Sequence, residues 1–458
     1  MKSYDSYVHC QQLWNEKFPS HWDIIPMYAI AKEKTVCNCV DLPLLSVYLD
    51  VGVVPFASRA EKRANATSKD LSKYQRVDYG DFVLNNQQAW RGSVGVSFHT
   101  GIVSPAYVVV SLDDSLNSKY ANYLLRSRVM VDQYLINSKS VGSIQRNIYW
   151  PALKRTRVII PPIEEQVQIA SFLDWKTSMV NRLINTKRQE IIMADAMKRS
   201  VIRSAVTKGL NPDAKMKYSG VKWLGDIPAH WKMIRGKNLY EKMQRSVQET
   251  DEVITCFRDG TVTLRRNRRT TGFTESLKEI GYQGIRKGDL VIHVMDAFAG
   301  AIGVSDSDGK GTPVYSVCHA KGDSNNHYYA FLLREMAKAG YIQSLYRGIR
   351  ERSSDFRFEV FGAQFYPVPP RSEQDQIVEY LSDTLTRINK LSAVREKQIE
   401  QLEALKTRLI SDVVTGKIDV RGIEIPDYDF VAEEADATVD LEADAENDEE
   451  SETEEQED

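Results

Sequence analysis

The side chains best suited to chemistry in this sequence are cationic and amide groups gathered in polar loops. One loop, residues 258–270, contains five arginines: Arg258, Arg265, Arg266, Arg268 and Arg269. A guanidinium group can donate two hydrogen bonds to one guanine edge or clamp a phosphate. Because so many like charges in one loop repel each other, we expect this loop to face an anion.

Three further kinds of stretch have the same polar character. The first contributes Arg59, Lys62 and Arg63, and the second contributes Asn85, Asn86, Gln87, Gln88 and Arg91. The third type of stretch occurs twice, with Arg146 at one place and with Arg350 and Arg352 at the other. Amide side chains match the paired donor and acceptor of adenine. All of these residues are candidates for DNA contacts, and the alternative for each charged run is a solvated face.

Signs of catalysis are missing from the sequence. It has neither a Gly-x-x-x-x-Gly-Lys phosphate loop nor a glycine-rich dinucleotide turn, and no His/Cys cluster has metal-ligand spacing. Asn211-Pro212-Asp213 lacks the aromatic residue that an amino-methyltransferase motif needs, so we interpret it as a turn. His21 and His230, each beside a tryptophan, are interpreted as structural. We predict no catalytic residue, no metal site and no cofactor bound by this chain.

The chain is duplicated, which explains why its polar loops come in pairs. Gly80-Asp81 recurs as Gly288-Asp289, and Glu165-Gln166 recurs as Glu373-Gln374, both 208 residues later. Several matches at one shift indicate two half-units in tandem. The hydrophobic scaffold repeats while the polar loops diverge. Two domains that recognise different short nucleotide sequences would need a common scaffold with different polar loops.

Each half-unit is expected to contain short strands, a packed helix and then a long helix. Buried strands are predicted at 82–84, 107–110, 157–160, 290–292 and 314–317, and packed helices at 120–126 and 328–334. Residues 163–206 and 371–415 contain neither glycine nor proline, which predicts two long amphipathic helices. We expect them to pair as a coiled coil through Leu173, Val180, Leu183, Leu381, Ile388, Leu391, Leu402 and Leu409. The alternative is that each helix only covers its own domain.

The charge of the chain is unevenly distributed. Its 458 residues have a formal net charge of -3, with 60 basic and 63 acidic residues. Fifteen of the acidic residues lie in 431–458, which has no Lys or Arg, so residues 1–430 carry +12. We hypothesise that this acidic tail screens the basic surface against non-specific DNA; the plainer alternative is a solubilising tail. Five scattered cysteines indicate reduced thiols, and no apolar run is long enough for a membrane span.

These residues carry a family resemblance over about residues 15–425. The features are the entries Pro19-Ser20-His21-Trp22 and Pro228-Ala229-His230-Trp231, the two Gly-Asp strands, residues 301–304, and the two Glu-Gln helix openings. In this doubled order they resemble the DNA-specificity subunit of type I restriction–modification enzymes. The acidic tail departs from that family.

The resemblance implies an α+β fold with pseudo-twofold symmetry. Two target-recognition domains with small mixed sheets, 1–160 and 213–368, would be joined by conserved helical regions, 161–212 and 369–425, that form an antiparallel coiled coil. Residues 426–458 would be a disordered acidic tail.

The resemblance also implies a function and partners. Each domain would read half of a bipartite site on double-stranded DNA. The implied partners are two methyltransferase subunits that use S-adenosylmethionine to methylate adenine N6. The resemblance further implies restriction subunits as partners. They would use ATP and magnesium to translocate and cleave unmodified DNA. This chain would be a non-catalytic, cytoplasmic subunit. The alternatives are an orphan subunit that serves methylation only and a coiled-coil scaffold that does not bind DNA.

Overall fold

The computed structural model describes residues 2–9, 17–49, 51–58, 70–141, 145–268, 280–345 and 355–432. These residues form two compact units. The first unit runs to Arg188 and resumes at Glu396, and the second is Gln189–Arg395. Each unit therefore contains one recognition domain and half of each long helix, whereas the sequence analysis placed the helices in segments of their own.

The first unit is built on a four-stranded sheet in the order β4-β11-β8-β9. Its strands are antiparallel and comprise β4 (Ala31–Glu33), β11 (Tyr107–Leu112), β8 (Phe82–Asn85) and β9 (Val94–Val96). Side chains alternate between its two faces. Phe82 and Leu84 join the main core, whereas Val83 and Val109 join a separate cluster on the other face. The predicted strands at 82–84 and 107–110 are confirmed.

Shorter antiparallel pairs and helices surround this sheet. The pairs are β1 (Tyr7–His9) with β2 (Lys17–Pro19), β3 (Asp23–Pro26) with β14 (Arg157–Ile160), β5 (Leu45–Tyr48) with β6 (Gly52–Pro55), β7 (Gln75–Val77) with β10 (Gly101–Val103), and β12 (Ser138–Val141) with β13 (Gln145–Ile148). The helices are α1 (Ser118–Leu125), α2 (Arg128–Ile136) and α3 (Trp150–Leu153), with short 3₁₀ turns η1 (Met27–Ala29), η2 (Phe56–Ser58) and η3 (Ala89–Arg91).

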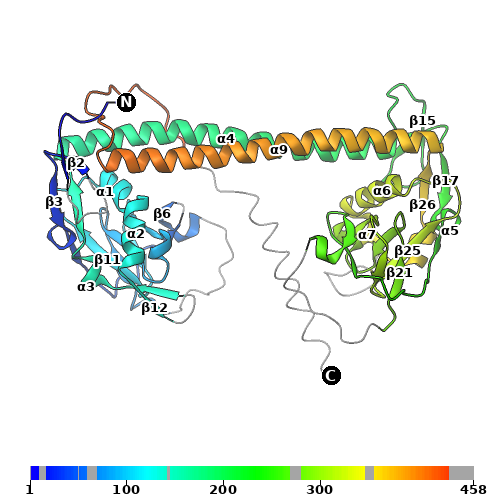
Figure 1. Ribbon diagram of the computed structural model, residues 1–458, viewed down its shortest axis with the longest axis horizontal. Helices are drawn as coiled ribbons and strands as arrows, with labels where there is room; N and C mark the ends of the chain where they lie inside the picture. The colour runs from blue at the N-terminus through cyan, green and yellow to red at the C-terminus, as the bar shows by residue number, and fades with distance from the viewer. Residues whose placement is uncertain are drawn as a thin grey trace. The chain divides into compact units, whose positions relative to one another are not determined.

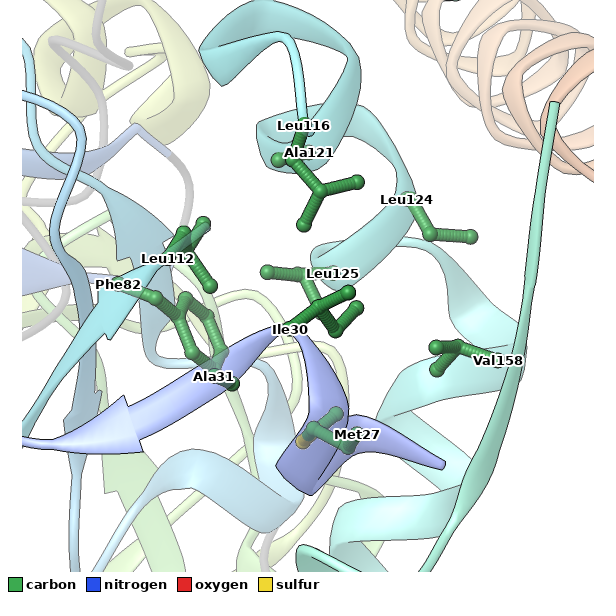
Figure 2. Close-up of a pocket in the computed structure, with 10 residues that line it drawn as sticks. All are labelled: Met27, Ile30, Ala31, Phe82, Leu112, Leu116, Ala121, Leu124, Leu125 and Val158. Carbon is green, nitrogen blue, oxygen red and sulfur yellow. The ribbon is translucent and has the colours of Figure 1, made fainter. Parts of the chain in front are cut away.

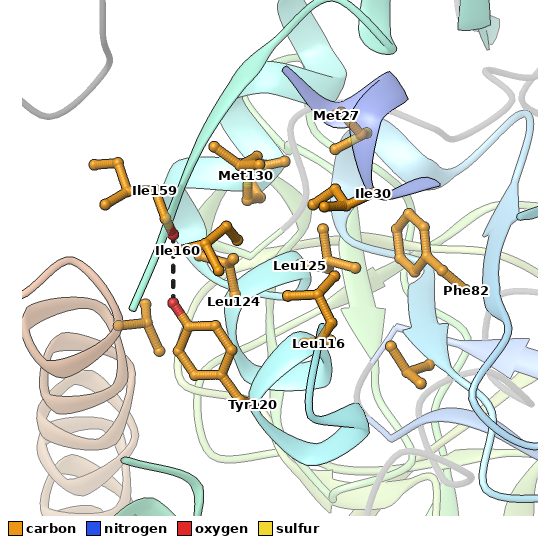
Figure 3. Close-up of a cluster of buried hydrophobic side chains, with 14 of the residues drawn as sticks. Met27, Ile30, Phe82, Leu116, Tyr120, Leu124, Leu125, Met130, Ile159 and Ile160 are labelled. Carbon is orange, nitrogen blue, oxygen red and sulfur yellow. Dashed lines mark hydrogen bonds between the residues drawn. The ribbon is translucent and has the colours of Figure 1, made fainter. Parts of the chain in front are cut away.

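The main core of the first unit lies between the sheet, α1, α2 and β14. Figure 3 shows its side chains converging from these elements, with Tyr120 donating a hydrogen bond to the carbonyl of Ile159. A void of about 10 Å³ lined only by apolar side chains remains inside it (Figure 2). A space of that size holds at most one water molecule, and an apolar lining offers that water no partner. The void is therefore part of the core and has no features of a ligand site.

The second unit repeats this architecture. Its sheet has the order β18-β25-β22-β23, formed by β18 (Tyr240–Lys242), β25 (Tyr315–Ala320), β22 (Leu290–His293) and β23 (Ile302–Val304). The antiparallel pairs are β15 (Met216–Tyr218) with β16 (Asp226–Pro228), β17 (Lys232–Arg235) with β26 (Phe365–Val368), β19 (Ile254–Cys256) with β20 (Val262–Leu264), and β21 (Gln283–Ile285) with β24 (Gly309–Gly311). Its helical segments are α5 (Gly236–Leu239), α6 (Asn326–Lys338), α7 (Tyr341–Ser344) and α8 (Phe358–Ala363), with 3₁₀ turns η4 (Arg265–Asn267) and η5 (Ala297–Ala299).

The two long helices are α4 (Ile163–Lys208) and α9 (Arg371–Val414), which lie side by side in Figure 1. In the first unit, the N-terminal part of α4 meets the C-terminal part of α9. Arg188 pairs with Glu403 at 3.4 Å there, and Lys406 Nζ donates to Asn181 Oδ1 at 3.2 Å. In the second unit, the other halves meet, and Arg395 pairs with Glu190. The pairing is therefore antiparallel, as the resemblance implied.

The eight residues predicted for the seam between the helices differ in burial. Leu173, Leu381 and Ile388 are buried, and Val180, Leu402 and Leu409 are half-buried. Leu183 and Leu391, which occupy the same place in the two repeats, are 50% and 46% exposed. Ile184, the neighbour of Leu183, is buried, because each residue turns a helix by about 100° and so faces a different side. The polar residue Thr177 is also buried, and its hydroxyl lies 3.2 Å from that of Tyr123 in α1.

The first unit is closed by the two ends of the described chain. An isolated bridge joins Lys2 to Asp419, and Tyr7 Oη donates to the carbonyl of Gly416 at 3.1 Å. Residues 418–432, which we call the strap, then run along the surface of α4. The sequence analysis placed 426–458 in one disordered tail, but residues 426–432 are hydrogen-bonded to α4 through Ser178, Asn181 and Asn185. Residues 433–458 lie outside the described part of the chain.

Candidate nucleic-acid interface

Six of the sixteen predicted DNA contacts lie outside the described residues: Arg59, Lys62, Arg63, Arg269, Arg350 and Arg352. The other ten fall in three places, which are the β19–β20 hairpin region, the loop after β8, and the β12–β13 hairpin. All three are connections between strands, the part of a fold in which binding residues are most often found.

In the second unit, the predicted arginines lie in and after the β19–β20 hairpin. The strands pair from Ile254–Leu264 to Cys256–Val262, and Gly260 closes the turn at φ +87°. A side chain is disfavoured there because of that φ and because a Cβ would lie 2.5 Å from Arg334 Nη1. Arg334 supports the turn from α6, and burial lowers its pKa from the ordinary value of an arginine.

The arginines of this region have acidic partners within the chain. Arg266 pairs with Glu252 at 2.7 Å and Arg268 with Asp259 at 2.6 Å. Arg258 pairs with Asp296 at 3.2 Å. The expectation that these arginines must face an external anion is therefore wrong for these three, because carboxylates already offset their repulsion. The pairs are solvent-exposed, so each contributes at most about 1 kcal/mol and a phosphate could replace the carboxylate.

The arginine Arg268 also stacks on an aromatic ring. Its guanidinium lies 4.4 Å from the centre of the Phe257 ring. Arg265 Nε, in the same turn, donates weakly to Thr255 Oγ1 at 3.4 Å. Burial first raises the pKa of the Asp259 carboxyl, but hydrogen bonds from Thr261 and Arg268 outweigh it and lower the pKa overall. Asp259 therefore stays ionised and holds Arg268 over Phe257 at neutral pH.

In the first unit, the amide loop after β8 is held from within. Asn85 Oδ1 accepts from the backbone N–H of Gln87 at 3.2 Å, and Trp90 Nε1 donates to the Gln87 carbonyl at 3.0 Å. Asn86 Oδ1 accepts from the backbone N–H of Ile148 in β13 at 2.9 Å. The predicted adenine readers Asn85 and Asn86 thus use their acceptor oxygens to shape the loop. Gln87 and Arg91 remain exposed, and Gln88 is half-buried.

The bond from Asn86 brings two predicted regions together. It ties the loop to the β12–β13 hairpin, which carries Arg146. Two aromatic residues in this region, Trp90 and Tyr149, are not among the predicted contacts. Lys139 Nζ lies 3.6 Å from the centre of the Tyr149 ring, and Arg91 lies 4.7 Å from that of Trp90. Cations next to aromatic rings suit nucleic acids, and the signal in the sequence was the aromatic residue beside each basic stretch.

The matched loop of the second unit is built differently. His293 Nδ1 accepts from the backbone N–H of Asp296 at 3.1 Å, and Asp296 in turn holds Arg258 of the β19–β20 hairpin. Each unit therefore couples the loop after its Gly-Asp strand to a neighbouring hairpin. The first unit does so through a neutral amide, and the second does so through an ion pair. The two surfaces present different donors and acceptors on one scaffold, as two different half-sites would require.

The described residues offer little else of a functional kind. Within them, no three His, Cys, Asp or Glu side chains are grouped to hold a metal ion. Among the helices that the structure describes, none is long and apolar enough to cross a membrane. Burial raises the pKa of the Cys256 and Cys318 thiols well above the ordinary value, so neither is a reactive thiolate.

A duplicated α+β unit with divergent polar loops and an antiparallel helix pair is the architecture that the resemblance to DNA-specificity subunits implied. Residues 35–193 match the family model described as the type I restriction modification DNA specificity domain. This match and the similarities below support a DNA-specificity subunit of the type I restriction–modification class, whose function is sequence-specific DNA recognition.

The proteins similar to this chain include two curated relatives and one solved structure. The type I restriction enzyme MjaVIII specificity subunit of Methanocaldococcus jannaschii is 22% identical over 77% of this chain and 84% of its own length. The putative MjaX specificity subunit of the same organism is 22% identical over 77% and 81%. A chain solved in work on complex assembly and conformational transition of the type I R-M system has a TM-score of 0.62 at 14% identity, covering 88% of this chain and 100% of that one. The last similarity confirms the fold.

Proposed function

We propose that this chain directs a type I restriction–modification complex to a bipartite site on double-stranded DNA. Each unit would read one half-site, and the paired helices would set the spacer between them. The single observation that carries the proposal is the contrast between the repeats. The buried scaffold is the same in both, whereas Asn86 with Ile148 in one and Arg258 with Asp296 in the other present different polar groups.

The chemistry of modification and restriction would belong to partner subunits. Two methyltransferase subunits would use S-adenosylmethionine to methylate adenine N6. Restriction subunits would use ATP and magnesium to translocate and cleave unmodified DNA. The chain itself would be non-catalytic and would act in the cytoplasm, where the chromosome lies. The loops support this division because their arginines and amides suit recognition, while the buried groups on the scaffold serve packing.

Methylation mapping tests the proposal. The chain is expressed with its methyltransferase partner in a host that lacks both, and methylated adenines are then mapped across the genome by long-read sequencing. We expect one bipartite motif that disappears when this gene is deleted. A continuous motif, or a bipartite motif that persists without this chain, would overturn the proposal. The same mapping with a restriction subunit added distinguishes a full enzyme from a subunit that serves methylation only.

A further inference from the structure

The strap, residues 418–432, is held on α4 by a specific set of polar side chains. Asn181 Nδ2 donates to the carbonyl of Val431 at 3.0 Å, and Asn185 Nδ2 to that of Ala432 at 3.1 Å. Ser178 Oγ accepts from the Val431 N–H at 2.8 Å. Further along α4, Gln168 Nε2 donates to the carbonyls of Val420 and Ile423 at 3.0 and 2.7 Å. These contacts reach the strap's backbone, so they recognise an extended chain and require no particular side chain in it.

The duplication places nearly the same set on α9 in the second unit. At the 208-residue shift, the side chains that hold the strap, Gln168, Ser178, Asn181 and Arg182, correspond to Gln376, Thr386, Asn389 and Lys390. One position differs, because Asn185 corresponds to Ala393. We call the surface formed by Gln376, Thr386, Asn389 and Lys390 the twin face.

The twin face is uncovered. Ser178 and Asn181 are buried under the strap, whereas their counterparts Thr386 and Asn389 are exposed. Gln376 is also exposed, and within the described part of the chain no side-chain hydrogen bond is made by it, by Thr386 or by Asn389. The repeat has therefore kept the donors and acceptors for an extended segment at a place where the described residues supply none.

An exposed aromatic ring lies on the same side of α9. Tyr380, one turn from Gln376, is 43% exposed, while its counterpart Phe172 on α4 is only 1% exposed. Phe172 belongs to a core cluster to which Ile423 and Ile425 of the strap contribute. Exposed polar residues alone are ordinary on a helix. A matched polar set beside an uncovered aromatic side chain is unusual. The covered counterpart, Phe172, lies in a cluster with aliphatic side chains of the strap, and Tyr380 has room for a similar neighbour.

We propose that the twin face is a docking site for an extended segment of a partner subunit. The segment would present backbone carbonyls to Asn389 and Gln376 and a branched aliphatic side chain to Tyr380. Lys390 would donate to a further backbone carbonyl of the segment, as Arg182 Nη2 donates to the carbonyl of Asp429 at 3.5 Å. The inference rests on the proposed function only in naming a subunit of the complex as the partner. The strap would cover the matching face of α4, while the twin face of α9 would stay open for the partner.

The strap's own sequence provides the probe. A fluorescein-labelled peptide of residues 418–432 is titrated with the full-length chain, and binding is followed by fluorescence anisotropy. We expect one peptide to bind per chain. Asn389→Ala should weaken binding about three- to tenfold, which corresponds to one net hydrogen bond. Ala393→Asn, which restores the missing counterpart of Asn185, should strengthen binding by a similar factor. Lys222→Ala, an exposed charge away from the twin face, is the control and should change nothing.

Several results would overturn the inference. One is the absence of binding. Another is binding that neither Asn389→Ala nor Ala393→Asn alters. A third is binding that only Asn181→Ala alters, because the peptide would then be displacing the strap. Self-association of the full chain that disappears on removal of the strap would assign the twin face to a second copy and would also overturn it. Because a gain of affinity cannot come from misfolding, Ala393→Asn keeps the test decisive. A chain that still directs methylation but fails these tests would overturn this inference alone.

Discussion

His21 lies 2.8 Å from Glu165, from Nε2 to Oε2, and the same pair recurs at 2.8 Å between His230 and Glu373. In both repeats the glutamate is in the first turn of a long helix, and the histidine comes from the entry of the preceding domain. The contact fixes where each helix leaves its unit. The repeated His-Trp entries are therefore structural, as the sequence analysis interpreted them.

The two pairs should differ in their contribution to stability. Glu165 is buried and also contacts Tyr4 Oη and Trp22 Nε1, the latter at 3.2 Å, while burial and this glutamate raise the pKa of Tyr4. We expect Glu165→Ala to lower the free energy of unfolding by about 2 kcal/mol or more, because it leaves buried donors unsatisfied. Glu373→Ala should cost less. Urea denaturation of the full chain measures both, and equal losses would contradict the expectation.

Asp419 should make stability depend on pH. Two hydrogen bonds from Arg421, at 3.0 and 2.8 Å, lower its pKa from the ordinary value. A lowered pKa means that the folded state favours the carboxylate, so the stabilisation is present above the ordinary carboxyl pKa and is lost as the pH falls through the folded value. Asp419→Asn should therefore destabilise the chain by up to about 1 kcal/mol at pH 7. In thermal melts the difference from the unsubstituted chain should shrink as the pH falls below the ordinary carboxyl pKa; a difference that stays constant would contradict the assignment.

The carboxylates beside the loop arginines should limit DNA binding. Glu252→Gln frees Arg266 and removes a negative charge, so we expect DNA affinity of the assembled complex to rise severalfold at low salt. Arg266→Ser should lower affinity and reduce the slope of log K against log salt by about one. Titrations at several salt concentrations check both changes. If Arg266 does not meet DNA, Arg266→Ser will leave the salt slope unaltered.

Asn86 and Gln87 are neighbours that should behave differently. Asn86→Ala removes the side-chain acceptor of the Ile148 N–H, which keeps the backbone carbonyl of residue 86 at 3.1 Å, so it should cost less than about 1 kcal/mol of stability and loosen recognition of one half-site. Gln87→Ala, at an exposed position whose backbone holds the loop, should leave stability unchanged and relax base choice within that half-site. Thermal melts and methylation mapping separate the two effects. Equal loss of stability in both variants would contradict this division.

The acidic residues after the strap give a fifth prediction. Residues 433–458 contain no Lys or Arg. If they screen the basic loops, a chain ending at Ala432, which keeps the strap, should bind non-specific DNA more tightly at low salt and equally at high salt. Mixed-sequence duplexes without a recognition site provide the measurement. Unchanged affinity at low salt would leave the tail as a solubilising segment only.

Much of the architecture was encoded locally and could be predicted from the sequence. The Gly-Asp turns before Phe82 and Leu290 and the long stretches without glycine or proline define strands and helices through short-range rules. The shift of 208 residues then shows that whatever one half forms, the other forms again. A resemblance spread over both halves identified the family for the same reason.

Tertiary structure alone decided which polar groups are available. Asn86 has the type of a base reader, yet a contact 62 residues away uses its acceptor. Arg258 has Asp259 next to it in the sequence, but its ion pair is with Asp296, 38 residues away. Leu183 fits an apolar repeat, but its direction depends on where the partner helix lies. Sequence determines the residue types and the repeat, whereas burial, pairing and exposure arise between distant segments, and only the folded chain can assign them.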